Sequence, residues 1–78
     1  MVKSIINNDV FQIVDGTAAV TIDDANTVQL YISSDGTNFT PKGDAITTPE
    51  TITIANAPQG LYCKLSGLTD GKKYTLIL

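Results

Sequence analysis

The chain has 78 residues, a net charge of −3 and five lysines as its only cations. Nucleic-acid binders carry a basic surface on which arginine is the usual contact residue, so this composition argues against a nucleic-acid partner. No apolar run is long enough to span a membrane, and a single cysteine, Cys63, excludes an intramolecular disulfide. Because a domain of this size buries only about 60% of the surface of its unfolded chain, we expect one domain, residues 1–78, that gains stability by association.

Short strands are the elements that the sequence predicts. No window has the i, i+3, i+4 spacing of an amphipathic helix, whereas Thr, Val, Ile and Tyr alternate with polar residues between turn signals. In chain order the expected strands are Val10–Val14, Thr17–Ile22, Thr27–Ser33, a short strand around Phe39, Glu50–Ala55, Leu61–Ser66 and Tyr74–Leu78, with Val2–Ile6 as an additional edge strand. About seven short strands at this spacing predict an all-β fold, a compact antiparallel β-sandwich or small barrel that is Ig-like or jelly-roll-like.

Three Asp-Gly pairs lie between the predicted strands, at Asp15-Gly16, Asp35-Gly36 and Asp70-Gly71. Glycine readily adopts the positive φ of tight turns, and aspartate tolerates it better than most residues. We therefore predict hairpin bends at all three pairs. Pro41 and Gly43 are expected to interrupt the pairing that follows Phe39, because proline cannot donate a ladder hydrogen bond.

Two of the predicted strands present polar and aromatic side chains on their outward faces. Alternation places Val28, Leu30, Ile32, Leu61, Cys63 and Leu65 inward, and Gln29, Tyr31, Ser33, Tyr62 and Lys64 outward. Tyrosine is enriched at protein interfaces, so Gln29, Tyr31, Tyr62 and Lys64 form one predicted interface. The other interpretation is a cross-strand tyrosine pair, or burial of both rings in a second layer.

The last strand consists of aliphatic residues up to Leu78. Chain ends fray unless they are held, so Leu76, Ile77 and Leu78 are expected to be buried in the domain itself or against a partner. One interpretation is that this strand and Val2–Ile6 are free sheet edges that pair with another subunit. The other is that both segments lie within a sheet, paired with each other or with internal strands.

The sequence gives no basis for a catalytic or metal site. There is no His, and the eight carboxylates are scattered over turns, so we expect no enzyme, no cofactor and no structural zinc. Cys63 is expected to be buried and inert, because its neighbour Lys64 lies on the opposite face of a strand. Asp23 and Asp24 are expected to be solvated loop acids rather than calcium ligands. The pattern of a secretory signal peptide is also missing.

Two segments resemble known β-modules. The run Gly67-Leu68-Thr69-Asp70-Gly71-Lys72-Lys73-Tyr74 resembles the G-L-x-x-G-x-x-Y corner of fibronectin type III domains, which implies that the tyrosine hydroxyl caps the loop between two strands. The hairpin from Val28 to Pro41, with its Ser34-Asp35-Gly36 turn and Phe39, resembles hairpins in small β-modules of bacteriophage virions and in carbohydrate-binding sandwiches.

The whole chain, short, acidic and rich in Thr and Asn, is similar to small auxiliary capsid, head-fibre or tail proteins of phages. This resemblance implies a non-enzymatic capsid decoration or auxiliary head protein, assembled in the host cytoplasm and located in the virion. Its expected partners are the major capsid protein, other virion subunits or further copies of itself. The alternatives are a head-fibre or tail component, a carbohydrate-binding or adhesion module that uses Tyr31, Tyr62 and the Asp35–Asn38 loop, and part of an extracellular immunoglobulin-like array.

Overall fold

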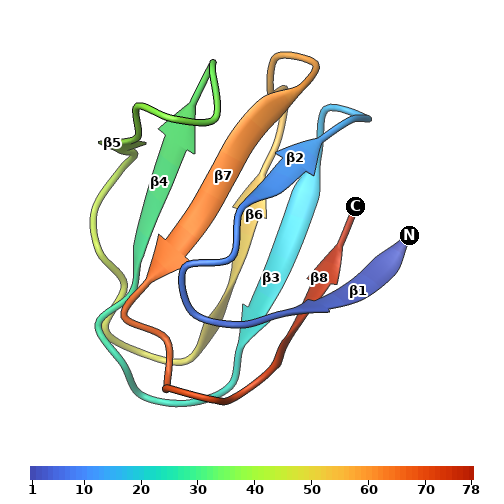
Figure 1. Ribbon diagram of the computed structural model, residues 1–78. Coiled ribbons are helices and arrows are strands. Elements are labelled where there is room, and N and C mark those ends of the chain that lie inside the picture. The colour runs from blue at the N-terminus through green and yellow to red at the C-terminus, as the bar shows by residue number, and fades with distance from the viewer.

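The computed structural model describes residues 1–78 and consists of eight strands without a helix (Figure 1). The strands are β1 (Val2–Ile5), β2 (Phe11–Ile13), β3 (Ala18–Ile22), β4 (Gln29–Ser33), β5 (Thr40–Pro41), β6 (Glu50–Ile54), β7 (Leu61–Ser66) and β8 (Tyr74–Ile77). The prediction of an all-β chain made of short strands is confirmed.

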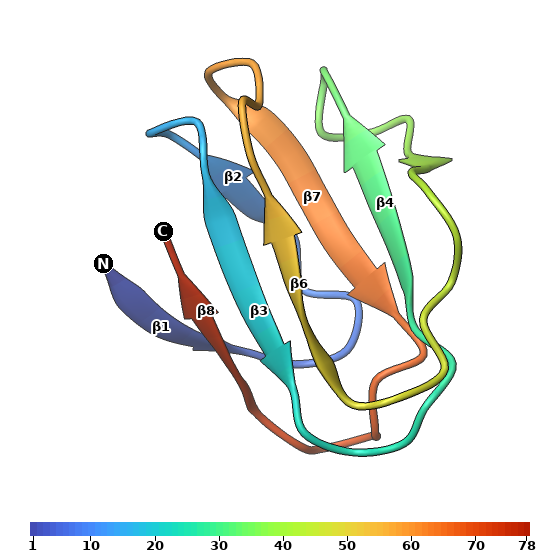
Figure 2. The same ribbon diagram turned by 180° about the vertical axis from the view of Figure 1, so that it is seen from behind.

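The strands form two four-stranded sheets that pack face to face as a β-sandwich (Figures 1 and 2). Sheet A has the order β1-β8-β3-β6, and sheet B has the order β2-β7-β4-β5. Every paired ladder in both sheets is antiparallel. The predicted antiparallel sandwich is therefore confirmed, and Val2–Ile5 does form an edge strand of sheet A.

The core lies between the inward faces of the two sheets. Its buried hydrophobic side chains are Ile5, Phe11, Ile13, Ala18, Val20, Ile22, Val28, Cys63, Leu65, Leu68, Tyr74 and Leu76. Along the strands these buried residues alternate with more exposed ones, as the two-residue period of a β-strand requires. Only 13 of the 78 residues are buried, so this is a lean core with little surplus apolar burial.

Only one of the three Asp-Gly pairs makes a hairpin. Asp35-Gly36 lies between β4 and β5, which pair within sheet B, as predicted. The prediction is wrong for Asp15-Gly16 and Asp70-Gly71, because each of these pairs lies in a connection that crosses from one sheet to the other. The first crossing is held by neighbouring loop residues: the Ala57 N–H donates to the Gly16 carbonyl at 2.9 Å. Turn chemistry predicted the bends but not the sheet that each strand joins.

Both chain termini lie within sheet A and beside each other (Figures 1 and 2). β8 is an interior strand between β1 and β3, and the Leu78 N–H donates to the Met1 carbonyl at 2.8 Å. The interpretation of β8 as a free edge is therefore wrong, and the alternative that the two ends pair with each other is confirmed. The edges of the sandwich are β1 and β6 in sheet A, and β2 and β5 in sheet B.

The strand predicted around Phe39 forms one residue later, as Thr40–Pro41. Pro41 lies opposite Tyr31, but β5 is the outer strand of sheet B, so its missing N–H is tolerated at this edge. Pro41 therefore belongs to a strand instead of interrupting one.

Candidate functional site

The predicted interface residues of β4 and β7 share the outer face of sheet B. Tyr31 lies directly opposite Lys64, and Gln29 lies opposite Ser66. Tyr62 lies opposite Ser33 on one side and Gln12 on the other, so Tyr31 and Tyr62 are diagonal neighbours rather than a directly opposed pair. Gln29, Tyr31, Tyr62 and Lys64 are all partly exposed. The structure thus brings this predicted group together on one surface.

Phe39 is an additional member of this surface that the sequence did not place. The Lys64 ammonium lies 4.7 Å from the centre of the Phe39 ring and 5.8 Å from that of Tyr31, within the range of cation–π attraction. Phe39 follows a turn, across which the strand period carries no information about faces. The outer face of sheet B therefore holds three of the five aromatic residues of the chain: Tyr31, Phe39 and Tyr62.

The β4–β5 turn packs beside this aromatic face and is held by its own hydrogen bonds. Asp35 Oδ1 accepts the N–H groups of Thr37 and Asn38 at 2.8 and 2.9 Å. These bonds, that of the Asn38 N–H above all, hold the pKa of Asp35 well below its usual range. Ser33, predicted to face outward, is buried because its hydroxyl donates to Asp35 at 2.7 Å and accepts the Gly36 N–H at 2.9 Å.

The backbone conformation and the surroundings of Gly36 explain why this turn needs glycine at that position. Its φ is +78°, and a Cβ at this position would lie 3.3 Å from three ring atoms of Tyr62. The Tyr62 ring therefore packs directly against the turn backbone, which fixes the turn relative to the aromatic face.

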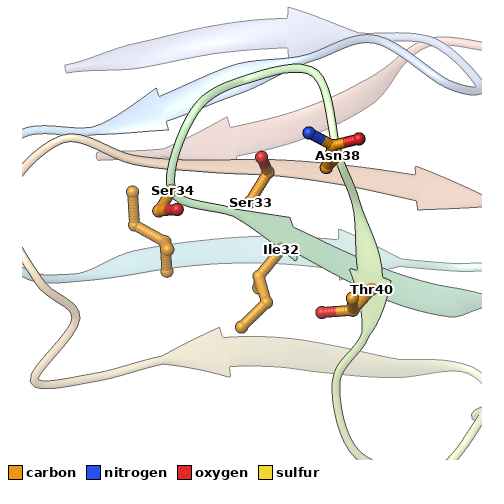
Figure 3. Close-up of a pocket in the computed structure, with 6 residues that line it drawn as sticks. Ile32, Ser33, Ser34, Asn38 and Thr40 are labelled. Carbon is orange, nitrogen blue, oxygen red and sulfur yellow. The ribbon is translucent and has the colours of Figure 1, made fainter.

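Two neighbouring cavities open beside β4 on the flank between the sheets. The larger, about 310 Å³, is lined by Ile32, Ser33, Ser34, Asn38, Thr40 and Leu61, and Figure 3 shows Ile32 and Thr40 on the adjacent strands β4 and β5. The second, about 200 Å³, is mainly apolar and is lined by Leu30, Ile32, Lys42, Ile54, Ala55, Asn56, Ala57, Pro58 and Leu61. Ile32 and Leu61 line both cavities, so the two are adjacent. We call the cavity-lining residues together with β6 the open flank.

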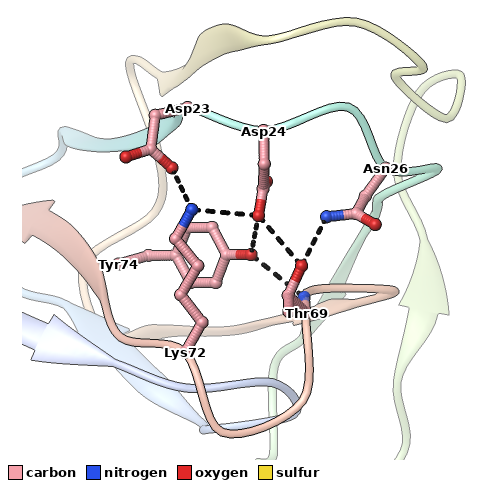
Figure 4. A network of polar contacts seen from close by, with 6 residues as sticks. All are labelled: Asp23, Asp24, Asn26, Thr69, Lys72 and Tyr74. Carbon is pink, nitrogen blue, oxygen red and sulfur yellow. Dashed lines mark hydrogen bonds and ion pairs between the residues drawn. The ribbon is translucent and has the colours of Figure 1, made fainter.

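A polar network, shown in Figure 4, joins two loops that lie at the lower end of the sandwich in Figure 1. The Tyr74 hydroxyl donates to Asp24 Oδ2 at 2.7 Å and accepts the Thr69 N–H at 3.0 Å. The local geometry is that of a tyrosine corner, in which the hydroxyl bonds to the backbone a few residues upstream. The same Asp24 oxygen accepts the Thr69 hydroxyl at 2.9 Å, and Asn26 donates to that hydroxyl at 2.8 Å. The network therefore links the β3–β4 loop to the β7–β8 loop.

Lys72 completes this network. Its ammonium lies 2.6 Å from Asp23 Oδ1 and 3.0 Å from Asp24 Oδ2. The bonds from Tyr74 above all, and then from Lys72, hold the pKa of Asp24 well below its usual range, and the bonds to Asp23 and Asp24 raise the pKa of Lys72. The other Asp24 oxygen, Oδ1, is buried without a hydrogen-bond partner. Asp23 and Asp24 thus hold two loops together through Lys72.

The remaining chemically reactive groups are not arranged as a site. Cys63 is fully buried in β7, and this burial raises the pKa of its thiol to about 11, so the thiol is protonated at neutral pH. No three His, Cys, Asp or Glu side chains are grouped in a way that could hold a metal ion. The structure also contains no helix long and apolar enough to cross a membrane.

The predicted interface residues of the last strand differ in burial, because successive side chains of β8 point to opposite faces of the sheet. Leu76 has no exposed surface and belongs to the core, so its prediction as an interface residue is wrong. Ile77 points the other way and is 48% exposed, directly opposite Val2, which is 68% exposed. Leu78 is partly buried and packs against the core.

Other exposed large hydrophobic side chains also lie in or near the strands on this side of the sandwich. The complete set is Met1, Val2, Ile6, Val10, Val14 and Ile77, all of them in or next to β1, β2 or β8. We call these six residues the terminal flank. In both ribbon views β1 and β2 lie on the same side of the sandwich, opposite the open flank (Figures 1 and 2). Of this set, the sequence predicted Ile77 as an interface residue and, in one interpretation, Val2–Ile6 as an edge that pairs with another subunit. It placed Val10 and Val14 at the ends of a strand without assigning them to an interface.

Comparisons of the chain with protein families, with curated proteins and with solved structures find no match.

Proposed function

We propose that this chain is a non-enzymatic structural subunit of a bacteriophage virion, a capsid decoration or auxiliary head protein that binds the major capsid protein through its terminal flank. The observation that carries the proposal is that all six exposed large hydrophobic residues lie in or next to β1, β2 or β8, on one side of the sandwich. Several exposed large apolar side chains on one side of a small domain are typical of a protein interaction surface.

The physical mechanism would be the burial of this flank on the shell. Covering apolar surface contributes roughly 25 cal/mol per Å² before the entropy cost of association. Repeated at every equivalent position of a shell, such contacts would hold neighbouring capsid subunits together against internal pressure. The small core of the free domain also supports a subunit that gains stability when it docks.

The direct test is quantitative mass spectrometry of density-gradient-purified particles from a phage that carries this gene. The proposal predicts the chain in the particles at a fixed ratio to the major capsid protein. Particles assembled with Val2→Asp or Ile77→Asp should lose most of the chain, whereas Thr75→Asp, at another exposed position of β8, should be retained. Absence of the wild-type chain from the particles would reject the proposal.

A second candidate function, a carbohydrate-binding or adhesion module, is favoured by the aromatic face of sheet B. Tyr31, Phe39 and Tyr62 offer rings, and Lys64 offers a hydrogen-bond donor, on one partly exposed surface. A glycan-array signal that is lost in Tyr31→Ala and kept in Val2→Asp would favour this function. No signal with the wild-type chain would argue against it.

A further inference from the structure

β6 is the least protected edge of the sandwich. Natural edge strands avoid unwanted pairing by being short or by carrying charges, proline or bulges. β2 has three residues, β5 has two including Pro41, and β1 carries Lys3. β6 has five residues, is charged only at Glu50, and pairs with β3 in an unbroken register without a bulge. Its other side has no partner strand.

The space beside this edge is apolar and only partly filled. Ile52 and Ile54 lie opposite Val20 and Ala18, which are core residues, so both isoleucines face inward. They are nevertheless half-buried, and the same holds for Leu30 on the facing strand β4. The reason is that sheet A has no strand beyond β6, whereas sheet B continues from β7 to β4 and β5 (Figure 2). One further strand at the edge of β6 would cover these inward residues.

One charged residue, Lys42, lines the cavities beside β6. Lys42 is the only charged residue that lines either cavity, and it takes part in no ion pair. It shares its cavity with Ile54, at the end of β6. A carboxylate on an incoming strand, opposite Ile54 and on the inward face, would therefore lie on the same side as Lys42.

We propose that the open flank binds one extended segment of a partner protein, which adds to the free edge of β6, alternates polar and aliphatic residues, and places a carboxylate beside Lys42. A segment fits better than a second complete sandwich, because β4 and β5 extend past β6 and occupy the space that the other sandwich's second sheet would need (Figures 1 and 2). Main-chain hydrogen bonds would supply affinity, and the two cavities would select the aliphatic side chains. This inference uses the flank opposite the proposed capsid contact and stands independently of it.

The sequence of β6 itself supplies a probe with the required pattern. In an antiparallel alignment centred on Ile52, a blocked peptide Glu-Thr-Ile-Thr-Ile-Ala places its glutamate opposite Ile54. Titration of this peptide into the ¹⁵N-labelled chain, followed by NMR, should give saturable shifts at Glu50–Ile54, Leu30 and Lys42. A peptide with lysine in place of the glutamate should bind about threefold more weakly, as expected for one exposed ion pair.

Charge reversal separates this contact from non-specific association. In Lys42→Glu the preference should invert, so that the lysine peptide binds more tightly than the glutamate peptide. Lys3→Glu, on the opposite flank, should leave the preference unchanged, and the spectrum of each variant reports whether it is folded. The proposal is overturned if shifts fail to saturate, if they map to the terminal flank, or if Lys42→Glu binds both peptides as the wild type does.

Discussion

The two flanks of the sandwich differ in how completely the chain closes them. On the side of β1 and β2, the inward residues Ile5, Phe11 and Ile13 are at most 3% exposed, and apolar side chains remain only on the outer surface. On the side of β5 and β6, the inward residues themselves are half-buried around two cavities. On the terminal flank the inward residues are buried and apolar side chains are exposed only on the outside, which suits docking onto a surface. On the open flank the inward residues are incompletely buried, which suits the addition of a strand that would cover them.

The largest expected difference between the flanks concerns core truncation. Ile13→Ala should destabilise the domain by about 3–4 kcal/mol, because this fully buried side chain leaves a cavity that its neighbours cannot fill. Ile54→Ala should cost less than that, since its side chain is only partly buried. Urea denaturation of both variants measures the difference. Equal losses of stability would mean that the open flank is as well packed as the closed one.

A glycine pair tests how tightly the end of the sandwich beside the Asp24–Tyr74 network is packed. Gly67 has a φ of +95°, and a Cβ there would collide with the Thr27 backbone, whereas Gly43 has a φ of +72° with open space around it. Gly43→Ala should cost about 1 kcal/mol of left-handed strain. Gly67→Ala should cost about 3 kcal/mol, because overpacking adds to the strain. Similar denaturation midpoints for the two variants would contradict the close approach of these loops.

The tyrosine corner should contribute less. Tyr74→Phe removes a hydroxyl that donates to Asp24 and accepts from Thr69, so a loss of about 1.5 kcal/mol is expected. Tyr31→Phe is the matched control, because the Tyr31 hydroxyl makes no hydrogen bond within the chain. Thermal melts of the two variants should differ by several degrees. No difference would mean that the corner does not hold the loops.

The smallest expected effect is a dependence of stability on acid pH. The pKa values of Asp24 and Asp35 are lowered in the folded state, so their contribution is complete above the unfolded pKa of about 4 and is lost as the pH falls below it. The free energy of unfolding should therefore decrease between about pH 5 and pH 2. In Asp24→Asn this decrease should be shallower than in the wild-type chain. If the free energy of unfolding of Asp24→Asn fell with pH as steeply as that of the wild type, Asp24 would not be a source of this pH dependence.

The sequence predicted the fold better than it predicted the surfaces. Alternation of apolar and polar residues placed Leu61–Ser66 as a strand with its observed bounds and placed Tyr31 and Lys64 on one face. It could not decide which sheet a strand joins, because a glycine with positive φ serves a hairpin and a crossing between sheets equally well. Asp15-Gly16 is the example.

The alternation of apolar and polar residues along a strand also does not show which distant strands will pair with it. Leu76 looked like part of an edge, but pairing with both β1 and β3 places it in the core. Val2 and Ile77 are separated by most of the chain, so their shared exposed surface appears only once the sheet order is known. Both flanks are products of this order rather than of any local motif.

The most direct test of the proposed role is lysine cross-linking followed by mass spectrometry on purified particles that contain the chain. Docking through the terminal flank predicts cross-links from Lys3, which lies on the exposed edge strand β1, to the major capsid protein. Lys64, on the aromatic face of sheet B, should give few or none. Cross-links to the major capsid protein from Lys64 alone would contradict the terminal flank as the capsid contact.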